Sequence, residues 1–152
     1  MLYFAYASNM DWVQMRERCP SAQFVCIARL PGHRLAFTRK SIKRGCGVAD
    51  GVPDEHLDLW GVVYEVSERD FGNLDRSEGY VPGRETNAYT RDKREVLADG
   101  DEHKPVTVCI YFARKEPNPP LPNEEYKHLI VEGAKFWRLP AEYIARLEEV
   151  ET

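Results

Sequence analysis

The sequence lacks the patterns that would assign it a metal or a nucleophilic mechanism. Its four cysteines form no CxxC pair, and its four histidines stand at no metal-ligand spacing. No Ser/His/Asp or Cys/His pattern typical of a nucleophilic hydrolase is present either. We therefore predict no metal site, and we expect Cys19, Cys26, Cys46 and Cys109 to be reduced thiols of a cytoplasmic protein.

Long apolar runs and an excess of positive charge are also missing. No segment approaches the ~20 apolar residues of a membrane span, and Met1–Phe4 does not resemble the start of a signal peptide. The formal net charge is −4, which is unfavourable for binding nucleic acid. The basic run of Arg39, Lys40, Lys43 and Arg44 is interpreted as a solvated loop. We expect neither a membrane nor a nucleic-acid partner.

What the chain does contain is typical of one globular domain over residues 1–152. Hydrophobic residues make up 43% and charged residues 30%, enough for a single core. The residue patterns predict strands over Leu2–Ala7, Ala22–Leu30, His33–Phe37, Leu57–Val66, Tyr89–Leu97 and Val106–Ala113. They predict helices over Trp12–Arg18, Ser67–Leu74, Asn123–Phe136 and Ala141–Val150.

The connections complete this prediction. We expect a turn at Pro31-Gly32, a long loop over Ser41–His56, a polar turn over Asp75–Tyr80 and a loop over residues 81–88. Strands outnumber helices, and the hairpin-like spacings favour antiparallel or mixed pairing. The predicted class is α+β, with a closed or nearly closed small sheet flanked by helices.

Two segments are candidate sites on their residues alone. The turn Tyr6–Asn9 lies between a strand and a helix, where unpaired backbone N–H groups can bind a carboxylate. Such a turn is more often a plain N-cap. Glu78 stands beside Gly79, where a carboxylate can act as general acid or base, but most of the 25 acidic residues must be surface charge.

Several stretches in order resemble the γ-glutamyl cyclotransferase family. Leu2–Met10 (LYFAYASNM) is similar to the family's N-terminal signature, usually YGSN, and Leu74-Asp75 to Glu78-Gly79 is similar to the segment that carries its catalytic glutamate. The resemblance covers nearly the whole chain. Further matching stretches are Pro20–Ala22, Ala28–Leu30, Leu59–Tyr64, Tyr126-Lys127, Gly133–Lys135 and Leu139–Tyr143.

The resemblance implies a mixed α/β fold built on a small β-barrel with flanking helices. It also implies conversion of a γ-glutamyl amide into 5-oxoproline and a free amine or amino acid, as in glutathione metabolism. The family needs no cofactor, and homodimers occur in it. Glu78 would be the acid/base. The residues implied to bind the γ-glutamyl substrate are Tyr3, Phe4, Ala5, Tyr6, Ala7, Ser8, Asn9, Tyr111 and Tyr126.

One departure from the family concerns Ala7, where glycine is usual. If the position requires a positive φ, alanine would be strained, and if substrate must approach closely, the methyl group would narrow the pocket. The loop Tyr80–Ala88 also looks longer than is usual. Two alternatives to the leading function therefore stay open. One is a specialised cyclotransferase acting on a γ-glutamyl group carried by a larger biosynthetic amine, and the other is a non-catalytic binding module of the same fold.

Overall fold

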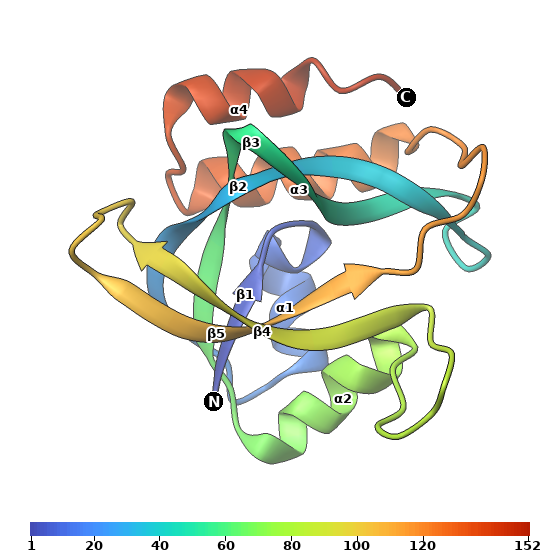
Figure 1. Cartoon of the computed structure of the whole chain (residues 1–152), viewed down its shortest axis with the longest axis horizontal. Helices are drawn as coiled ribbons and strands as arrows, with labels where there is room; N and C mark the ends of the chain where they lie inside the picture. The colour runs from blue at the N-terminus through green and yellow to red at the C-terminus, as the bar shows by residue number, and fades with distance from the viewer.

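A computed structural model describes all of residues 1–152 (Figure 1). The strands are β1 (Leu2–Ala5), β2 (Gln23–Ser41), β3 (Cys46–Glu65), β4 (Tyr89–Ala98) and β5 (Pro105–Ala113). The helices are the short 3-10 helix η1 (Ser8–Met10), α1 (Trp12–Arg18), α2 (Glu68–Glu78), α3 (Glu124–Phe136) and α4 (Ala141–Glu148). None of these helices is both long and apolar enough to cross a membrane.

The five strands form a closed barrel in the order β1-β3-β2-β4-β5. Neighbouring strands are antiparallel except where β1 meets β5 in parallel, with Tyr3 opposite Cys109. Buried apolar side chains such as Phe4, Val62 and Ile110 fill the interior. The predicted α+β class and small barrel with flanking helices are therefore confirmed, and closure leaves no open sheet edge.

Strands β2 and β3 form one long hairpin, which the sequence-based prediction divided wrongly. Pairing runs from Gln23 opposite Glu65 to Ser41 opposite Cys46, so most of the expected loop over Ser41–His56 is strand. The expected turn at Pro31-Gly32 is a register irregularity within β2, where Gly32 has a φ of 70°. Proline and glycine mark bulges as well as turns, and the two are hard to separate by composition.

Helix α2 is longer than predicted and includes the expected polar turn. Its N-cap Ser67 accepts from the Asp70 N–H, and it continues to Glu78 before Gly79 ends it in the left-handed region, with a φ of 67°. The buried residues Asp70, Phe71, Leu74 and Asp75 recur at helical spacing. The segment 75–78 was wrongly predicted as a turn because its polar residues continue the helix to its last turn.

The helices lie on two sides of the barrel. Figure 1 shows α3 and α4 beside the β2–β3 hairpin and α2 on the opposite side. Helix α3 also packs closely against the first turn of the chain. A side chain at Gly133 would not fit there, because its Cβ would stand 2.6 Å from the Met10 carbonyl carbon. Trp137 Nε1, just past α3, donates to the Met10 carbonyl at 2.9 Å. The turn that follows β1 is therefore held against the C-terminal half of the chain.

Candidate active site

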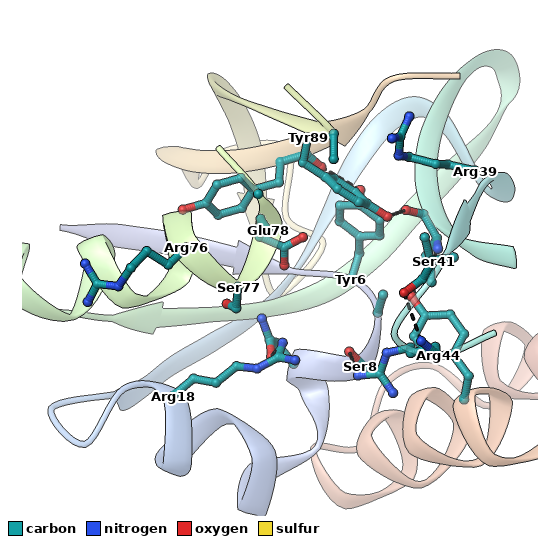
Figure 2. Close-up of a pocket in the computed structure, with 18 of the residues that line it drawn as sticks. Tyr6, Ser8, Arg18, Arg39, Ser41, Arg44, Arg76, Ser77, Glu78 and Tyr89 are labelled. Atoms are coloured by element: carbon teal, nitrogen blue, oxygen red, sulfur yellow. Dashed lines mark hydrogen bonds between the residues drawn. The ribbon is translucent and has the colours of Figure 1, made fainter. Parts of the chain in front are cut away.

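A cavity of about 340 Å³ opens between the η1 turn, the end of α2 and the barrel wall (Figure 2). Its lining combines segments that are far apart in the sequence, from Tyr3 to Tyr126. Ala5 is buried within β1 and does not line the cavity. The other predicted site residues all line it: Tyr3, Phe4, Tyr6, Ala7, Ser8, Asn9, Glu78, Tyr111 and Tyr126.

The η1 turn presents its polar groups to this cavity. Asp11, rather than Ser8 or Asn9, caps α1 by accepting from the Gln14 N–H at 2.9 Å. Ser8 Oγ and Asn9 Oδ1 instead accept from the Gln14 side-chain amide, each at 2.9 Å. The Met10 N–H turns back to the Ala7 carbonyl, while the Ala7 N–H has no acceptor within the protein. A free backbone donor beside a preformed polar turn suits a carboxylate.

Ala7 adopts a φ of −132°, so the position does not require the left-handed conformation that favours glycine. The methyl group is accommodated without that backbone cost. Ala7 lines the cavity, and its side chain occupies space that a glycine would leave open. Of the two expected consequences of this residue, the strained backbone does not occur, and the narrower pocket stays a prediction.

Glu78 is the last residue of α2, and its carboxylate is directed into the cavity on the side of Tyr6 (Figure 2). Burial raises the pKa of Glu78 to about 7, and the nearby guanidinium groups of Arg18 and Arg44 offset part of that rise. No donor within the protein pairs with this carboxylate. A carboxyl group with a pKa near neutrality can both take up and release a proton at physiological pH.

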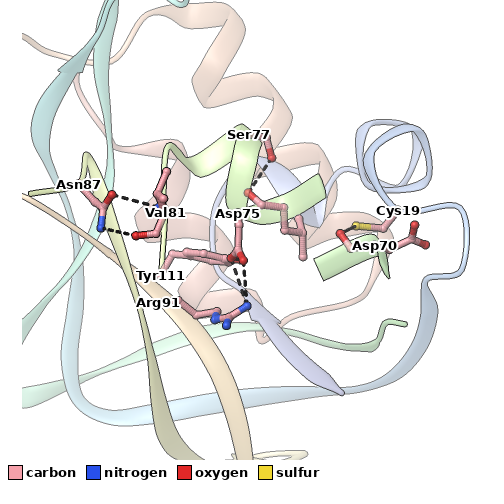
Figure 3. Close-up of polar contacts among 9 residues, drawn as sticks. Cys19, Asp70, Asp75, Ser77, Val81, Asn87, Arg91 and Tyr111 are labelled. Atoms are coloured by element: carbon pink, nitrogen blue, oxygen red, sulfur yellow. Dashed lines mark hydrogen bonds and ion pairs between the residues drawn. The ribbon is translucent and has the colours of Figure 1, made fainter. Parts of the chain in front are cut away.

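Three of the tyrosines in the cavity wall have hydroxyl protons that are already engaged. Tyr6 donates to the Tyr111 carbonyl, and Tyr89 donates to the Ala49 carbonyl. Tyr111 donates to Asp75 Oδ1 at 2.6 Å, and the same carboxylate pairs with Arg91 at 3.0 Å (Figure 3). These three hydroxyls shape the wall but have no proton to offer a ligand.

Tyr3 and Tyr126 differ because their hydroxyls accept. The Ala49 N–H donates to the Tyr126 hydroxyl at 3.0 Å. The Asn9 amide group donates to the Tyr3 hydroxyl at 2.9 Å, and its orientation is fixed because Asn9 Oδ1 accepts from Arg18, which can only donate. Burial raises the pKa of Tyr3 well above its usual value. Both hydroxyls therefore keep a proton free to donate into the cavity.

Several lining residues were missed by the sequence analysis. Arg44 was wrongly interpreted as part of a solvated loop: its guanidinium lies 4.8 Å from the centre of the Tyr126 ring and donates to Gln14 Oε1 at 2.9 Å. Arg39 and Lys40 line the cavity as well, and Arg18 and Tyr89 join from α1 and β4. No local motif marks these residues, because only the closed barrel brings them together.

No group of three or more His, Cys, Asp or Glu side chains is arranged to hold a metal ion. The polar side chains of the cavity are one carboxylate, several guanidinium and hydroxyl groups, one ammonium group and one amide. This donor set matches an anionic organic molecule better than a divalent cation, which prefers several oxygen or nitrogen ligands of negative or neutral charge.

The comparisons with known proteins agree with this site. Residues 58–147 match the model of the AIG2-like family. The γ-glutamylcyclotransferases of Homo sapiens and Mus musculus are each 32% identical over 99% of this chain and 78% of their own length. A solved γ-glutamyl cyclotransferase structure superposes with a TM-score of 0.88 at 30% identity, covering 99% of this chain and 88% of that one. The chain therefore belongs to the AIG2-like family and, within it, to the γ-glutamylcyclotransferases.

Proposed function

We propose that this protein cleaves a γ-glutamyl amide by intramolecular cyclisation, releasing 5-oxoproline and the free amine. The observation that carries the proposal is Glu78, a half-buried carboxylate that has no partner in the protein and lines the cavity, where burial raises its pKa to about 7. The substrate supplies its own nucleophile, because its α-amine can close a five-membered ring on the γ-carbonyl carbon. The absence of a nucleophilic triad from the chain is compatible with this chemistry.

The bond changes need three proton transfers. The α-ammonium loses one proton, the amine attacks the γ-carbonyl to form the new C–N bond, and the old C–N bond breaks as the departing nitrogen gains a proton, while the new ring nitrogen loses a second one. Glu78 acts as base toward the α-ammonium, passes that proton to the departing nitrogen as acid, and then takes the second proton from the ring nitrogen and releases it to the free amine or to solvent. Its pKa of about 7 lies close to the ~8 of a free α-amine, so the first transfer is not strongly uphill.

The η1 turn holds the glutamyl α-carboxylate in this proposal. The free N–H of Ala7, the Ser8 hydroxyl and the Arg44 guanidinium surround that end of the cavity, and Arg44 Nη2 lies 3.4 Å from Ser8 Oγ. Tyr126, beneath the same guanidinium, donates its free hydroxyl proton to the carboxylate. Holding the chain coiled in this way supports cyclisation, since well-placed intramolecular reactions gain up to ~7–11 kcal/mol.

The Tyr3 hydroxyl donates to the oxyanion that develops on the γ-carbonyl oxygen. Tyr6, Tyr89 and Tyr111 are unsuited to this role because their protons are engaged elsewhere. Asn9 further polarises the Tyr3 O–H by donating to its oxygen. Negative charge builds up on that oxygen only in the transition state, so this contact should lower the barrier more than it strengthens substrate binding.

Tyr3→Phe tests this assignment. We expect kcat to fall about tenfold or more, with KM little changed, because the lost hydrogen bond strengthens mainly in the transition state. Tyr143→Phe is the matched control, since the Tyr143 hydroxyl is buried without a partner in the C-terminal helix. An equal fall in both variants, or a rise in KM alone for Tyr3→Phe, would remove Tyr3 from the oxyanion role.

The proposed reaction is tested by the fate of solvent oxygen. The protein is incubated in H₂¹⁸O with γ-glutamyl-alanine, glutathione or a γ-glutamyl polyamine, and the products are analysed by mass spectrometry. Cyclisation gives unlabelled 5-oxoproline, whereas hydrolysis gives glutamate carrying one ¹⁸O. An N-acetylated γ-glutamyl-alanine should give no product, because its nitrogen cannot attack. Formation of labelled glutamate would show that the protein hydrolyses the amide and does not cyclise it. If no substrate is turned over, the binding-module alternative would be favoured.

The setting of the reaction is part of the proposal. All four cysteines are free, which supports a reducing, cytoplasmic location. A place in glutathione metabolism is proposed from the family resemblance alone. The homodimer implied by the family resemblance is retained as a proposal. Sedimentation of the purified protein would distinguish one copy from two.

A further inference from the structure

The charges in the cavity wall are strongly unbalanced. Five basic residues line the cavity, namely Arg18, Arg39, Lys40, Arg44 and Arg76, against the single carboxylate of Glu78. The chain as a whole carries a formal net charge of −4, so this concentration of positive charge is local. Arg76 contributes least, because its guanidinium extends away from the cavity and donates to Asn73 (Figure 2).

The remaining cations fall into two pairs. Arg18 and Arg44 are the inner pair: they donate to Asn9 Oδ1 and Ser8 Oγ of the η1 turn, and both lower the pKa of Glu78. The γ-glutamyl group brings one α-carboxylate to this turn. Together with the carboxylate of Glu78, it balances the two positive charges of the inner pair.

Arg39 and Lys40 are the outer pair, at the end of β2 where it borders the cavity. The Arg39 side chain is 25% exposed, and its nearest acid is Glu116, at 3.8 Å. That separation makes an ion pair but is too long for a hydrogen bond, and Arg39 Nη1 donates to the Arg114 carbonyl at 3.3 Å. Glu116 Oε1 accepts from the Lys40 backbone N–H at 2.8 Å. Figure 2 shows Arg39 extending toward the Tyr89 side of the cavity, away from Arg18. The Lys40 ammonium and the remaining N–H groups of Arg39 have no partner within the protein, and the glutamyl group, held at the η1 turn, offers them none.

We propose that the preferred leaving amine is an acidic amino acid, with its two carboxylates bound by Arg39 and Lys40. This inference rests on the proposed function, because it concerns the half of the substrate that departs. A γ-glutamyl dipeptide of this kind carries three carboxylates, which together with Glu78 give four negative charges opposite the four cations, and its one ammonium group is the proton donor to Glu78. A polyamine leaving group would instead place further positive charge beside Arg39 and Lys40, where like charges repel.

An isosteric pair of substrates isolates the charge. γ-Glutamyl-glutamate and γ-glutamyl-glutamine have nearly the same size but differ by one carboxylate. We expect kcat/KM to be at least about fivefold higher for γ-glutamyl-glutamate at low salt, as for a partly exposed ion pair. The preference should shrink as ionic strength rises. γ-Glutamyl-putrescine should be cleaved more slowly than either.

Variants locate the effect. Arg39→Gln and Lys40→Gln should each reduce the preference, and the double variant should abolish it while still cleaving γ-glutamyl-glutamine. Lys43→Gln is the matched control, because Lys43 is exposed in the adjoining turn and does not line the cavity. Equal kcat/KM values for the two substrates would overturn the inference, as would a preference that survives the double variant.

Binding separates this inference from the reaction itself. The Kd values of the two dipeptides are measured by calorimetry with a Glu78→Gln variant, which retains the outer pair. Tighter binding of γ-glutamyl-glutamate, lost on adding Arg39→Gln and Lys40→Gln, supports the inference even if no 5-oxoproline forms. Indistinguishable Kd values overturn it even if cyclisation is established.

Discussion

Asp70 and Glu78 lie near opposite ends of α2, and the pKa values of their carboxyl groups are shifted in opposite directions. Asp70 is in the first turn, and hydrogen bonding from Ser21, including a backbone N–H at 2.8 Å, lowers its pKa. Glu78 is the last helical residue, and burial in the cavity raises its pKa to about 7. The positive end of the helix dipole favours the first charge and the negative end disfavours the second.

The comparison separates a structural carboxylate from a reactive one on the same helix. Hydrogen-bond donors directed at the Asp70 carboxylate stabilise its charged form and keep it ionised. Glu78 has no such donors, so its charged form is costly and its proton is easily exchanged. The carboxylate of Asp75, between them in the helix, accepts a hydrogen bond from Tyr111 and forms an ion pair with Arg91 (Figure 3). The lack of partners is what makes Glu78 suitable for proton transfer.

The largest expected contrast is in activity. Glu78→Gln should lower kcat by about 100-fold or more, since general acid–base catalysis contributes that much or more to many reactions. Asp70→Asn should leave kcat nearly unchanged in the folded protein, because its carboxylate lies outside the cavity wall. Steady-state rates of 5-oxoproline formation, corrected for the folded fraction by circular dichroism, measure both. Retained activity in Glu78→Gln would end the proposed mechanism.

Stability should respond in the opposite sense. Asp70→Asn should destabilise the protein by about 1 kcal/mol at neutral pH, through the weaker hydrogen bond to Ser21. Glu78→Gln should stabilise it there, because no buried charge remains. Urea denaturation monitored at several pH values gives both free energies of unfolding.

The pH dependence of the two changes in unfolding free energy, for Asp70→Asn and Glu78→Gln, tests whether the shifted pKa values cause them. The lowered pKa of Asp70 means that its contribution is present above the usual value of 3.8 and is lost as pH falls further. The raised pKa of Glu78 means that the parent loses stability relative to Glu78→Gln as pH rises from 4.5 to about 7, with no further change above. Parallel curves for the two variants would contradict the comparison.

The rate should also follow the ionisation of Glu78. We expect kcat/KM to rise with pH through about 7, as the free enzyme's Glu78 becomes the base, and to fall near ~8, as the substrate ammonium loses its proton. The two steps belong to the coupled system rather than to single groups. A pH profile of kcat/KM without a rising limb in the neutral range would argue against Glu78 as the base.

The smallest expected effect comes from a neighbouring charge. Arg18 lowers the pKa of Glu78, so Arg18→Gln should move the rising limb of the profile to higher pH. Arg16→Gln is the matched control, since Arg16 lies over the Trp12 ring on the same helix and does not line the cavity. A shift of equal size in both variants would indicate a general field effect rather than contact in the cavity.

Much of the fold was predictable, and the largest error, over Ser41–His56, has a physical cause. The helices α1, α3 and α4 and the hairpin β4–β5 follow local signals such as the Asn123 cap and the Asp99-Gly100 turn. The misread segment over Ser41–His56 contains Asp50, which looks like a loop residue but is buried. Its carboxylate accepts from the Thr38 hydroxyl of β2 and the Ala113 N–H of β5, a strand that does not pair with β3. A buried polar residue with distant partners gives no local sign of its strand.

The site was predictable in a different way. The residues alone gave the Tyr6–Asn9 turn and Glu78 as candidates, and family resemblance selected them from many similar turns and acids. Nine of the ten predicted residues line one cavity, and only Ala5 does not. Arg18, Arg39 and Arg44 were not predicted, because in the sequence each is indistinguishable from an ordinary surface charge. Only the folded barrel brings them to one cavity.

The amino-acid sequence by itself determined the α+β class, the family and the identity of the candidate acid/base. These depend on composition, periodicity and motifs that are read along the chain. Only the tertiary structure decided that Glu78 has a pKa of about 7, that Tyr3 and Tyr126 keep free protons, and that the leaving-group end is cationic. Those properties depend on burial and on hydrogen-bond partners supplied by distant segments, so they exist only once the chain is folded.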